Sequence, residues 1–588
     1  MAGAAKVSVA GVAERREALE RRHRPWRGRS LAALLDEVAA EHPDRAFVIT
    51  DDGTWTYREL SEWSRAIGRG LVDRGVKAGE HVAVVLPNGP ETIAVKFAIA
   101  RAGAVAVPVN ILLKAEELGY VLGQSRSVAL VTMEEFRGID ALETLDQVTP
   151  GWENGGASET LPDLRLVVTV PKGPGRSGQG TASRRPGVLD LAGLAHDPDP
   201  ALDAELDRRT AAVEPGDTAS IFYTSGTTGQ AKGVISTHDM ELRSAYGSAY
   251  TRAFEDGRRI LFALPLHHVF AYVEGLLASM FVAGAVVVQA AFDPKATLEA
   301  VEKHGANEAL FVPTMSLAIV DAARGGGYDL GSLHSVMSAA ASAPARLWQD
   351  LNEVLGVEQL VTAYGMTETA AATTFTMPGD PIEHLVDTVG NPKLGGIAGD
   401  PGLDGRLAEY RTVDPTGALL PDGEEGELVA RGPIITPGYF DKPRETAEAT
   451  LADGWLRSGD LGIVREDGYL VLTGRSKELY KCGGELVMPG EVEARLTRLP
   501  DVAQAHVVGV PDERMGEVGC AWIVPTEGAT PDADALVGYC SDELARFKVP
   551  KYVLFTTADR LPLTASGKVQ KFRLAQQATE QLGLAEQS

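Results

Sequence analysis

The sequence of 588 residues predicts an α/β fold in two domains, 1–476 and 477–588. The first is expected to hold stacked, mostly parallel βα sheets, because helical and extended patterns alternate from about residue 30 onward. Short runs with Asp-Pro-Thr-Gly and Pro-Asp-Gly turns between residues 408 and 439 indicate a β-rich subdomain. The segment after residue 477 has its own βα pattern, which predicts a small α+β C-terminal domain with its own core.

The N-terminal elements follow from apolar spacing and capping signals. Residues 1–28 are rich in Ala, Arg and Glu, and are expected to form a helical or frayed extension. Thr56 and Glu59 form a capping box, which predicts a helix that ends near Asp73. Further elements are expected at residues 31–40 (helix), 46–50 (strand), 81–86 (strand), 91–101 (helix) and 104–109 (strand).

The alternation stops between residues 149 and 200, where the low-complexity run 173–183 predicts a mobile surface loop. Beyond it, strands are expected at residues 260–264, 284–289, 309–312 and 335–338. In the last segment, helices are expected at 491–498 and 535–544, and strands at 505–510 and 521–524.

Composition excludes several classes of protein. Hydrophobic residues make up 44% of the chain, which is enough for a large core. A formal net charge of -25 argues against nucleic acid or an anionic membrane surface as the main partner. The three cysteines suit a reducing compartment, and neither a signal peptide nor an apolar run of about twenty residues is evident. We therefore expect a cytoplasmic protein without an integral membrane segment.

The strongest local signal is the stretch Tyr223-Thr-Ser-Gly-Thr-Thr-Gly-Gln-Ala-Lys-Gly-Val234. Its glycines allow tight turns that bring backbone N–H groups close to a ligand, and Lys232 adds a positive charge. This combination is typical of a cradle for a polyphosphate. No Gly directly precedes Lys232 and no Ser or Thr follows it, so the stretch is not a Walker motif. Extended runs on both sides predict a loop between two strands; the alternative is a solvated Gly/Thr turn.

Five further stretches follow in order: Leu264-Pro-Leu-His-His268, Ala363-Tyr-Gly-Met-Thr-Glu368-Thr, Gly454-Trp-Leu-Arg-Ser-Gly-Asp460, Gly474-Arg475-Ser-Lys477-Glu-Leu-Tyr-Lys481 and Leu561-Pro-Leu-Thr-Ala-Ser-Gly-Lys568. Together with the first stretch they resemble the acyl-adenylate-forming enzymes, in the branch of acyl-CoA synthetases and aryl-CoA ligases. The resemblance covers about residues 30 to 575, apart from the tip around 173–187. It implies ATP, Mg²⁺ and coenzyme A as cofactors.

The resemblance assigns ATP binding to the stretches 223–234 and 363–369, and ribose binding to Asp460 and Arg475. Glu368 would place Mg²⁺ on the phosphates, Tyr364 would stack on adenine, and Thr367 would bond the α-phosphate. Asp460 would accept the ribose hydroxyls with support from Arg475, although an isolated Asp in such a turn is more often a turn-stabilising residue. The implied ATP-binding residues are Thr224, Ser225, Gly226, Thr227, Thr228, Gly229, Lys232, Tyr364, Gly365, Met366, Thr367, Asp460, Arg475 and Lys568.

The same resemblance implies the catalytic and thiol-binding residues. Lys568 would bridge the substrate carboxylate and the α-phosphate, and Lys477 would be the hinge about which the C-terminal domain rotates. Coenzyme A would pass the segment with Lys481, Gly483 and Gly484, beside which Cys482 is expected to be a buried, inert thiol. The implied catalytic residues are Lys568, Glu368, Thr228, His268 and Lys477; an isolated His such as His268 is usually structural.

The acyl pocket is expected to be apolar and to be lined by mostly small residues. These residues are His268, Phe270, Tyr272, Gly275, Val312, Ala339, Ala340 and Ala341. Two stretches depart from the family pattern: Gln230-Ala231 replaces the usual Pro before Lys232, and the stretch from Ser338 to Pro344 carries alanines where the family has glycine. The added methyl groups are expected to narrow the pocket. The amino-acid-selecting Asp of the family is not evident after His268, so a hydrophobic carboxylic acid is favoured over an amino acid.

Three functions remain open from the sequence. The first is an acid–CoA ligase that makes acyl-AMP and pyrophosphate, and then the CoA thioester. The second is the same adenylation followed by transfer to a separate carrier protein. The third is a catalytically silent acyl-nucleotide binder, against which the intact Lys232, Glu368, Asp460 and Lys568 argue. The acid and the oligomeric state, a homodimer included, are not determined by the sequence.

Overall fold

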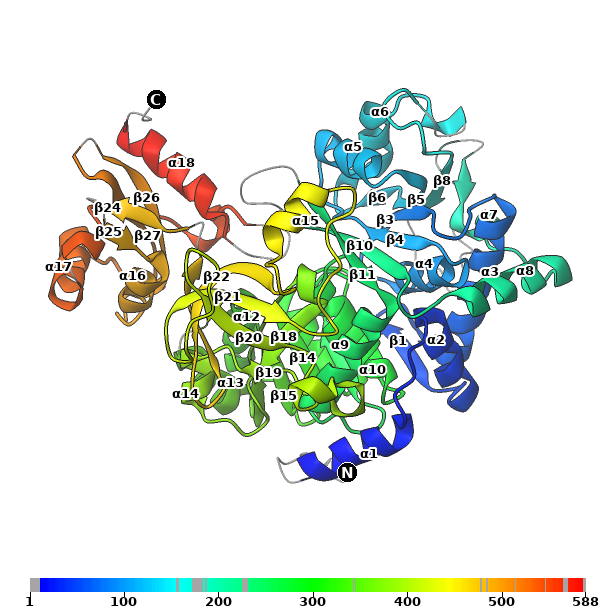
Figure 1. The fold of residues 1–588 in the computed structure, drawn as a ribbon, viewed down its shortest axis with the longest axis horizontal. Helices are drawn as coiled ribbons and strands as arrows, with labels where there is room; N and C mark the ends of the chain where they lie inside the picture. Colours follow the sequence, from blue (N-terminus) through cyan, green and yellow to red (C-terminus); the bar gives the residue numbers. More distant parts are fainter. Residues whose placement is uncertain are drawn as a thin grey trace.

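Two seven-stranded sheets, three smaller β-sheets and a separate C-terminal unit make up the fold (Figure 1). The smallest sheet is the hairpin of β6 (Glu135–Phe136) and β7 (Ile139–Asp140). The computed structural model describes residues 11–154, 158–171, 183, 185, 188–224, 231–341, 343, 345–475, 478–482, 485–512, 514–544, 546–563 and 569–584. Statements about structure refer to these residues.

The first large sheet has the strand order β16-β15-β14-β12-β13-β1-β2. Neighbouring strands are parallel except β1 and β2, which pair as an antiparallel hairpin. Its strands are β1 (Ala46–Thr50), β2 (Gly53–Thr56), β12 (Arg259–Phe262), β13 (Ala285–Val288), β14 (Glu308–Phe311), β15 (Ser335–Ser338) and β16 (Gln359–Val361). The near-continuous Val, Ile and Leu content of these strands is typical of a parallel sheet that is buried on both faces.

The second large sheet has the order β11-β10-β4-β3-β5-β8-β9, and only β10 and β11 pair antiparallel. Its strands are β3 (His81–Val85), β4 (Val105–Pro108), β5 (Ser127–Met133), β8 (Leu166–Val170), β9 (Leu189–Asp190), β10 (Thr218–Thr224) and β11 (Lys232–Thr237). The antiparallel hairpin of β10 and β11 stands at one edge of the sheet, and its two strands flank the glycine-rich stretch.

Helices fill the space between the two sheets. Residues from both sheets, from α3 (Tyr57–Asp73), α4 (Pro90–Arg101) and α9 (His238–Thr251), and from the π-helix η3 (Phe270–Leu277) belong to one hydrophobic cluster. Helix α4 is buried along almost its whole length, as expected for a helix that is covered on all sides. The remaining N-terminal helices are α1 (Val12–His23), α2 (Leu31–Glu41), α5 (Ala115–Gln124), α6 (Ala141–Val148), α7 (Leu191–Leu194), α8 (Pro200–Ala212), α10 (Ala278–Met280), α11 (Pro294–His304), α12 (Pro313–Arg324) and α13 (Ala345–Leu355).

A β-rich part follows these sheets. It contains β17 (Ala363–Met366), β18 (Ala371–Phe375) and β19 (Asn391–Pro392) in one sheet, and β20 (Glu409–Val413), β21 (Gly426–Arg431), β22 (Leu456–Val464) and β23 (Leu470–Arg475) in another. All pairs in these two sheets are antiparallel. The expected β-rich subdomain is therefore confirmed; α14 (Ile382–Asp387) and α15 (Pro443–Ala449) lie beside it.

The last part of the chain has its own hydrophobic cluster, with members from Tyr480 to Ala578. Its sheet contains β24 (Tyr480–Cys482), β25 (Glu485–Val487), β26 (Val502–Asp512), β27 (Gly516–Pro525) and β28 (Tyr552–Phe555). Its helices are α16 (Pro489–Leu496), α17 (Ala533–Glu543) and α18 (Lys571–Leu582). In Figure 1 this orange and red unit lies at one end of the long axis, apart from the large sheets.

Most of the expected elements are present, and one stretch is more regular than predicted. The capping box of Thr56 and Glu59 is formed, and α1 confirms the helical extension. Within residues 149–200, however, the sequence analysis missed β8, β9 and α7, because β8 is only five residues long and is flanked by irregular sequence. The run 173–183 lies outside the described residues except for Ser183. In the part that the structure describes, no helix is long and apolar enough to cross a membrane.

Burial of His238 makes the stability of the fold depend on pH. The residue begins α9, is 2% exposed, and accepts a hydrogen bond at Nδ1 from the Leu31 N–H at 3.2 Å. Burial lowers the pKa of His238 to about 4. Since the unfolded chain has the ordinary histidine pKa, it binds more protons below about pH 6.5, and folding stability falls as the pH drops toward 4.

We therefore expect His238 to contribute a loss on the order of 3 kcal/mol in the free energy of unfolding between pH 7 and pH 4. His238→Asn keeps an acceptor for the Leu31 N–H but cannot take up a proton. Urea unfolding of the variant should show a shallower pH dependence than the wild type. Parallel pH profiles of the two proteins would contradict this assignment.

Candidate active site

The β10–β11 hairpin positions the glycine-rich stretch. Thr224 pairs with Lys232, and Tyr223 pairs with Gly233, so the chain reverses between residues 224 and 232. The loop between two strands that the sequence predicts is therefore confirmed. Gly233 lies where an added Cβ would be 2.7 Å from the Ile221 side chain, which explains the need for glycine next to Lys232. Residues Ser225, Gly226, Thr227, Thr228 and Gly229 lie outside the described part of the chain.

Tyr439 joins a predicted ATP-binding residue, Lys232, to the predicted metal ligand Glu368. Its ring lies under the Lys232 ammonium, with Nζ 4.1 Å from the ring centroid, and its hydroxyl donates to Glu368 Oε1 at 2.8 Å. The backbone strengthens this link, because the Thr436 N–H donates to the Glu368 carbonyl and the Phe440 N–H donates to the Gly233 carbonyl, both at 2.8 Å. Burial and the Glu368 charge raise the pKa of Tyr439, so the phenol remains a donor. A cation and a carboxylate thus converge at the base of the hairpin loop.

Tyr364 and Asp460 form a second polar pair. Tyr364 donates its hydroxyl proton to Asp460 Oδ2 at 2.6 Å, and burial together with the Asp460 charge raises the pKa of this tyrosine well above its ordinary value. Asp460 lies in β22 opposite Arg475 of β23, and its N–H donates to Ser458 Oγ at 3.0 Å. Gly365 follows Tyr364 where an added Cβ would be 2.0 Å from the Ala371 carbonyl oxygen, so only glycine fits there. Thr367 and Glu368 begin the short 3₁₀ turn after Met366.

An apolar cavity of about 10 Å³ adjoins His268, which is room for about one water molecule. His268 Nδ1 accepts from the Phe270 N–H at 3.2 Å, which leaves Nε2 as the N–H of the neutral ring. The residues that line the cavity are Leu264, Pro265, His268, Phe270, Ala271, Val312 and Ala340. Four of these residues belong to the predicted acyl pocket.

Ala340 has a strained backbone. Its φ is +74°, a region that favours glycine, and the residue lines the cavity. The alanine that the sequence places where the family has glycine is therefore both a strained residue and a wall of the pocket.

Four other predicted acyl-pocket residues do not line this cavity. Tyr272 is buried, with its ring face 3.2 Å from Lys96 Nζ. At Gly275 an added Cβ would be 2.8 Å from the Phe262 ring, so this glycine permits η3 to pack closely on β12. Ala339 is buried at the end of β15, and Ala341 is exposed. For Tyr272 and Gly275, the π-helix η3 changes which side chains share a face, and the sequence does not show this.

A buried charge network ties η3 to the hairpin that carries Tyr364. Glu274 is fully buried, and its Oε1 lies 3.1 Å from Lys393 Nζ and accepts from the Ala372 N–H at 3.0 Å. Lys393 also donates to Ser244 Oγ at 2.9 Å, and burial lowers the pKa of Lys393 to about 8. The network fixes the acyl-side helix relative to β18.

The three cysteines are free and buried. Cys482 ends β24 beside the segment predicted to meet coenzyme A, and burial followed by the Asp512 charge raises its pKa. The expectation of a buried, inert thiol is supported. Lys477, Gly483, Gly484 and Lys568 lie outside the described residues, and for Arg475 and Lys481 only the backbone positions in β23 and β24 are described.

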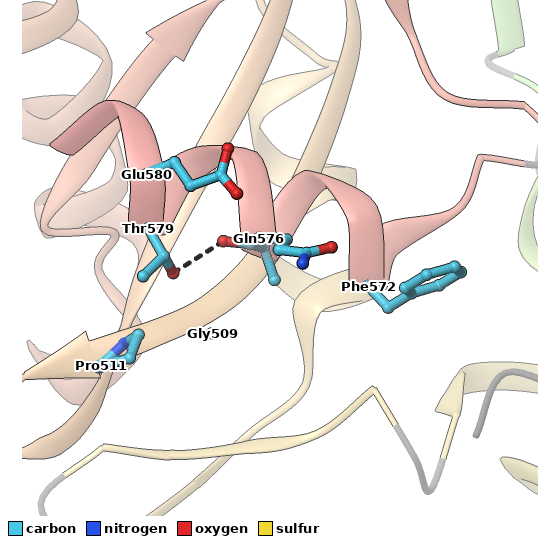
Figure 2. A pocket seen from close by; sticks show the side chains of 7 residues that line it. Gly509, Pro511, Phe572, Gln576, Thr579 and Glu580 are labelled. Carbon is cyan, nitrogen blue, oxygen red and sulfur yellow. Dashed lines mark hydrogen bonds between the residues drawn. The ribbon is translucent and has the colours of Figure 1, made fainter. Parts of the chain in front are cut away.

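A groove of about 380 Å³ opens on the C-terminal unit, away from these residues (Figure 2). It lies between β26 and α18, where Thr579 donates to the Ala575 carbonyl at 2.8 Å, and its rim includes the half-exposed Phe572. Its one ionisable lining residue, Glu580, is exposed. No predicted site residue lines the groove, so we assign the chemistry to the hairpin region.

The comparisons with known proteins agree with this geometry. The family described as "AMP-binding enzyme" matches residues 35–440, and "AMP-binding enzyme C-terminal domain" matches residues 491–568. The chain belongs to the AMP-binding enzyme family.

Similar proteins cover almost the whole chain. The chain is 33% identical over 569 residues to the putative acyl-CoA synthetase YngI of Bacillus subtilis. The match covers 95% of this chain and 98% of YngI. It is 35% identical to a feruloyl-CoA synthase of an Amycolatopsis species, over 88% of this chain and 92% of the relative. A ligase of Rhodococcus jostii named for a methyl-dioxo-octahydro-indenyl propanoyl group is 34% identical, and the match covers 92% of this chain and 97% of the ligase.

Solved structures of this family match as well. The anthranilate CoA ligase AuaEII with anthranoyl-AMP has a TM-score of 0.76 at 25% identity, covering 94% of this chain and 98% of that one. The o-succinylbenzoate coenzyme A synthetase MenE of Bacillus subtilis with ATP and a magnesium ion has a TM-score of 0.73 at 26% identity, covering 92% and 98%. The protein is thus an ATP-dependent acid–CoA ligase of this family, for which ATP, Mg²⁺ and coenzyme A are the cofactors.

Tyr439 was not expected among the site residues. Nothing in the run Thr436-Pro-Gly-Tyr439 distinguishes it from a turn. We expect Tyr439→Phe to keep the ring under Lys232 and to release Glu368, which should raise the Mg²⁺ concentration needed for half-maximal activity about 10-fold. A magnesium titration of the initial rate measures this effect.

Tyr469→Phe is the matched control for that titration. The Tyr469 hydroxyl also donates to a carboxylate, Asp380 Oδ2 at 2.7 Å, but this pair lies outside the candidate site. An equal shift in both variants would contradict a specific role for Tyr439.

Ala340→Gly should widen the acyl cavity at little cost in stability. A glycine at this φ relieves strain of about 1 kcal/mol, which offsets the larger backbone entropy that glycine loses on folding. We expect an unchanged thermal midpoint and a higher kcat/KM for bulkier acids, by about 10-fold. A variant with a lower midpoint and an unchanged acid preference would exclude Ala340 as a wall of the pocket.

Proposed function

We propose that the protein activates a hydrophobic carboxylic acid with ATP to acyl-AMP and pyrophosphate, and then forms the CoA thioester. The observation that carries this proposal is the apolar cavity beside His268. With the exception of His268, its lining residues carry no ionisable side chain. Such a cavity suits a hydrocarbon or aromatic acyl group and offers no partner for a charged amino group.

The nucleotide half of the site is proposed from the two polar pairs. The hairpin loop and Lys232 would hold the β- and γ-phosphates, since a cation and backbone N–H groups favour a polyphosphate. Tyr364 would offer its ring to adenine while its hydroxyl orients Asp460 toward the ribose hydroxyls. Arg475 would support the ribose from the neighbouring strand, and Thr367 would reach the α-phosphate.

Glu368 fits the metal that accompanies ATP. Mg²⁺ is usually bound through one or two carboxylates together with substrate phosphates. Tyr439 occupies Glu368 Oε1, and we propose that Oε2 is the metal ligand. The ion would neutralise charge on the phosphates.

The acid must approach an anionic phosphate, so the reaction needs a mobile cation. We propose that Lys568 supplies this charge between the substrate carboxylate and the α-phosphate, with Thr228 at the phosphates and His268 beside the acyl group. Residues 1–476 and 477–588 would act as two domains, with Lys477 as their hinge. Rotation would then exchange Lys568 for the segment with Lys481, Gly483 and Gly484, past which the thiol enters.

The named substrates of the relatives support a hydrophobic acid. One relative is named for ferulate and another for a bicyclic propanoate. Transfer to a separate carrier protein, instead of coenzyme A, remains the second candidate for the final step. Three buried thiols without disulfides support the proposed cytoplasmic location.

Mass spectrometry of the purified protein with ATP, Mg²⁺ and a panel of aliphatic, aromatic and polycyclic acids tests the proposal. Acyl-AMP without coenzyme A and acyl-CoA with it are the expected products. Acyl-AMP that persists in the presence of coenzyme A would favour a carrier protein as acceptor. Neither product from any acid would contradict the proposal.

We expect Lys568→Ala to lower the rate of acyl-AMP formation by about 10²–10³, the typical effect of one electrostatic group in a transition state. Thioester formation from supplied acyl-AMP should be much less affected, because Lys568 would have left the site by then. Lys571→Ala, which removes a nearby lysine that pairs with Glu478 and Glu493, is the control. A normal adenylation rate in Lys568→Ala would rule out this role.

A further inference from the structure

Five buried polar atoms without a hydrogen-bond partner lie in one place between the sheets. Within the described part of the chain, these atoms are Lys96 Nζ, Ser220 Oγ, Ser236 Oγ and both carboxylate oxygens of Glu241. Their residues are between 0% and 4% exposed. The Lys96 charge acts on Glu241, and the hydroxyl groups of Ser220, Tyr272 and Ser236 approach the Glu241 carboxylate, so the atoms form one cluster. None of the five atoms has a well-aligned hydrogen bond, whereas buried polar groups are nearly always paired, so the cluster retains hydrogen-bonding capacity that a further polar group could use.

The five atoms are not part of the charge network around Glu274. Lys96 comes from α4, Glu241 from α9, and the serines from the β10–β11 hairpin. Burial lowers the pKa of Lys96 and raises that of Glu241, while each group's charge opposes the shift of the other. A charge pair without close hydrogen bonds is costly in the interior unless a polar group completes it.

The hairpin links this cluster to the phosphate end of the site. Ser220 is opposite Ser236, Phe222 is opposite Val234, and Thr224 is opposite Lys232. Because side chains alternate along a strand, these three pairs share one face. That face is polar at the phosphate loop, apolar at Phe222 and Val234, and polar again at the serines, about 13 Å from Thr224.

The acyl-side helix covers the same face. Tyr272 follows Ala271, which lines the acyl cavity, and its ring lies 6.0 Å from the Phe222 ring. Lys96 Nζ is 3.2 Å from the Tyr272 ring centroid and 5.1 Å from that of Phe222. Tyr272 therefore connects the cluster to the segment that lines the cavity, and the two serines lie at the end of the hairpin away from Lys232.

We propose that this cluster, Lys96, Glu241, Tyr272, Ser220 and Ser236, is a polar subsite that binds a neutral oxygen substituent on the hydrophobic acid, far from its carboxylate. The inference rests on the proposed function. A hydroxyl group complements the pair best, because it can accept from Lys96 and donate to Glu241, and a ketone can accept from Lys96. A second carboxylate would meet the charge of Glu241 and is disfavoured.

The test compares decanoic acid with its mono-hydroxy and mono-oxo isomers, by the kcat/KM of acyl-AMP formation. We expect the best-placed oxygenated isomer to exceed decanoic acid by about 10-fold or more in the wild type, because a site built to bind an oxygen discriminates against its absence. The variant Lys96→Met with Glu241→Leu removes both charges together, so that neither is left unpaired. It should abolish this preference and leave decanoic acid within about threefold of the wild-type value.

Two further variants keep the test decisive. Tyr272→Phe retains the ring under Lys96 and should lower, but not abolish, the preference for the oxygenated isomer over decanoic acid. Arg69→Met with Asp203→Leu removes another buried-arginine pair, 2.8 Å apart and outside the site, and should leave the preference unchanged. If the first double variant does not fold, the wild-type preference and Tyr272→Phe still decide the matter.

Each outcome separates this inference from the proposed function. Decanoic acid preferred over every isomer, or a preference that survives the loss of Lys96 and Glu241, would overturn the subsite and leave the cluster to ordered water. In either case acyl-AMP would still form, so the ligase proposal would stand. Absence of acyl-AMP from every acid would instead contradict the proposed function.

Discussion

The fully buried carboxylate of Glu274 is the interaction on which the arrangement of the site depends. An unpaired charge at this depth would cost several kcal/mol, so Lys393 and the Ala372 N–H must both remain in contact with it. These contacts hold three elements together: the π-helix η3 beside the acyl cavity, helix α9 through Ser244, and strand β18 behind Tyr364. The acyl and nucleotide sides of the site therefore cannot shift independently.

The β10–β11 hairpin provides the second constraint. Its cross-strand register fixes which side chains face the helices, and a shift of one residue would turn Phe222 and Ser220 away from η3 and α4. The segment around Tyr439 adds to the β11 edge through backbone hydrogen bonds, which brings Glu368 to Lys232. One strand pair thus sets the position of Lys232, the carboxylate of Glu368 and the polar cluster at the far end of the hairpin.

Local signals predicted the fold well and the site only in part. The capping box at Thr56 and the strand at Ser335–Ser338 depend on neighbouring residues, and both are present. The link between Tyr439, Lys232 and Glu368 joins three distant segments, so no local pattern could indicate it. Tyr272 and Gly275 were expected in the acyl pocket, but they lie on the π-helix η3, where Tyr272 contacts Lys96 and Gly275 packs on Phe262. A charged residue within an apolar helix, such as Lys96, can be recognised in the sequence, but its role cannot be predicted until its partners in space are known.

The burial of Cys482 has a consequence for the survival of the enzyme itself. A mixed anhydride such as acyl-AMP acylates any thiolate that it meets, and the proposed route of coenzyme A passes beside this cysteine. Burial and the Asp512 charge keep the Cys482 sulfur protonated and shielded. Among the described residues, no exposed cysteine would then compete with the thiol of coenzyme A for the activated acyl group. Turnover would therefore not inactivate the protein by modifying its own chain.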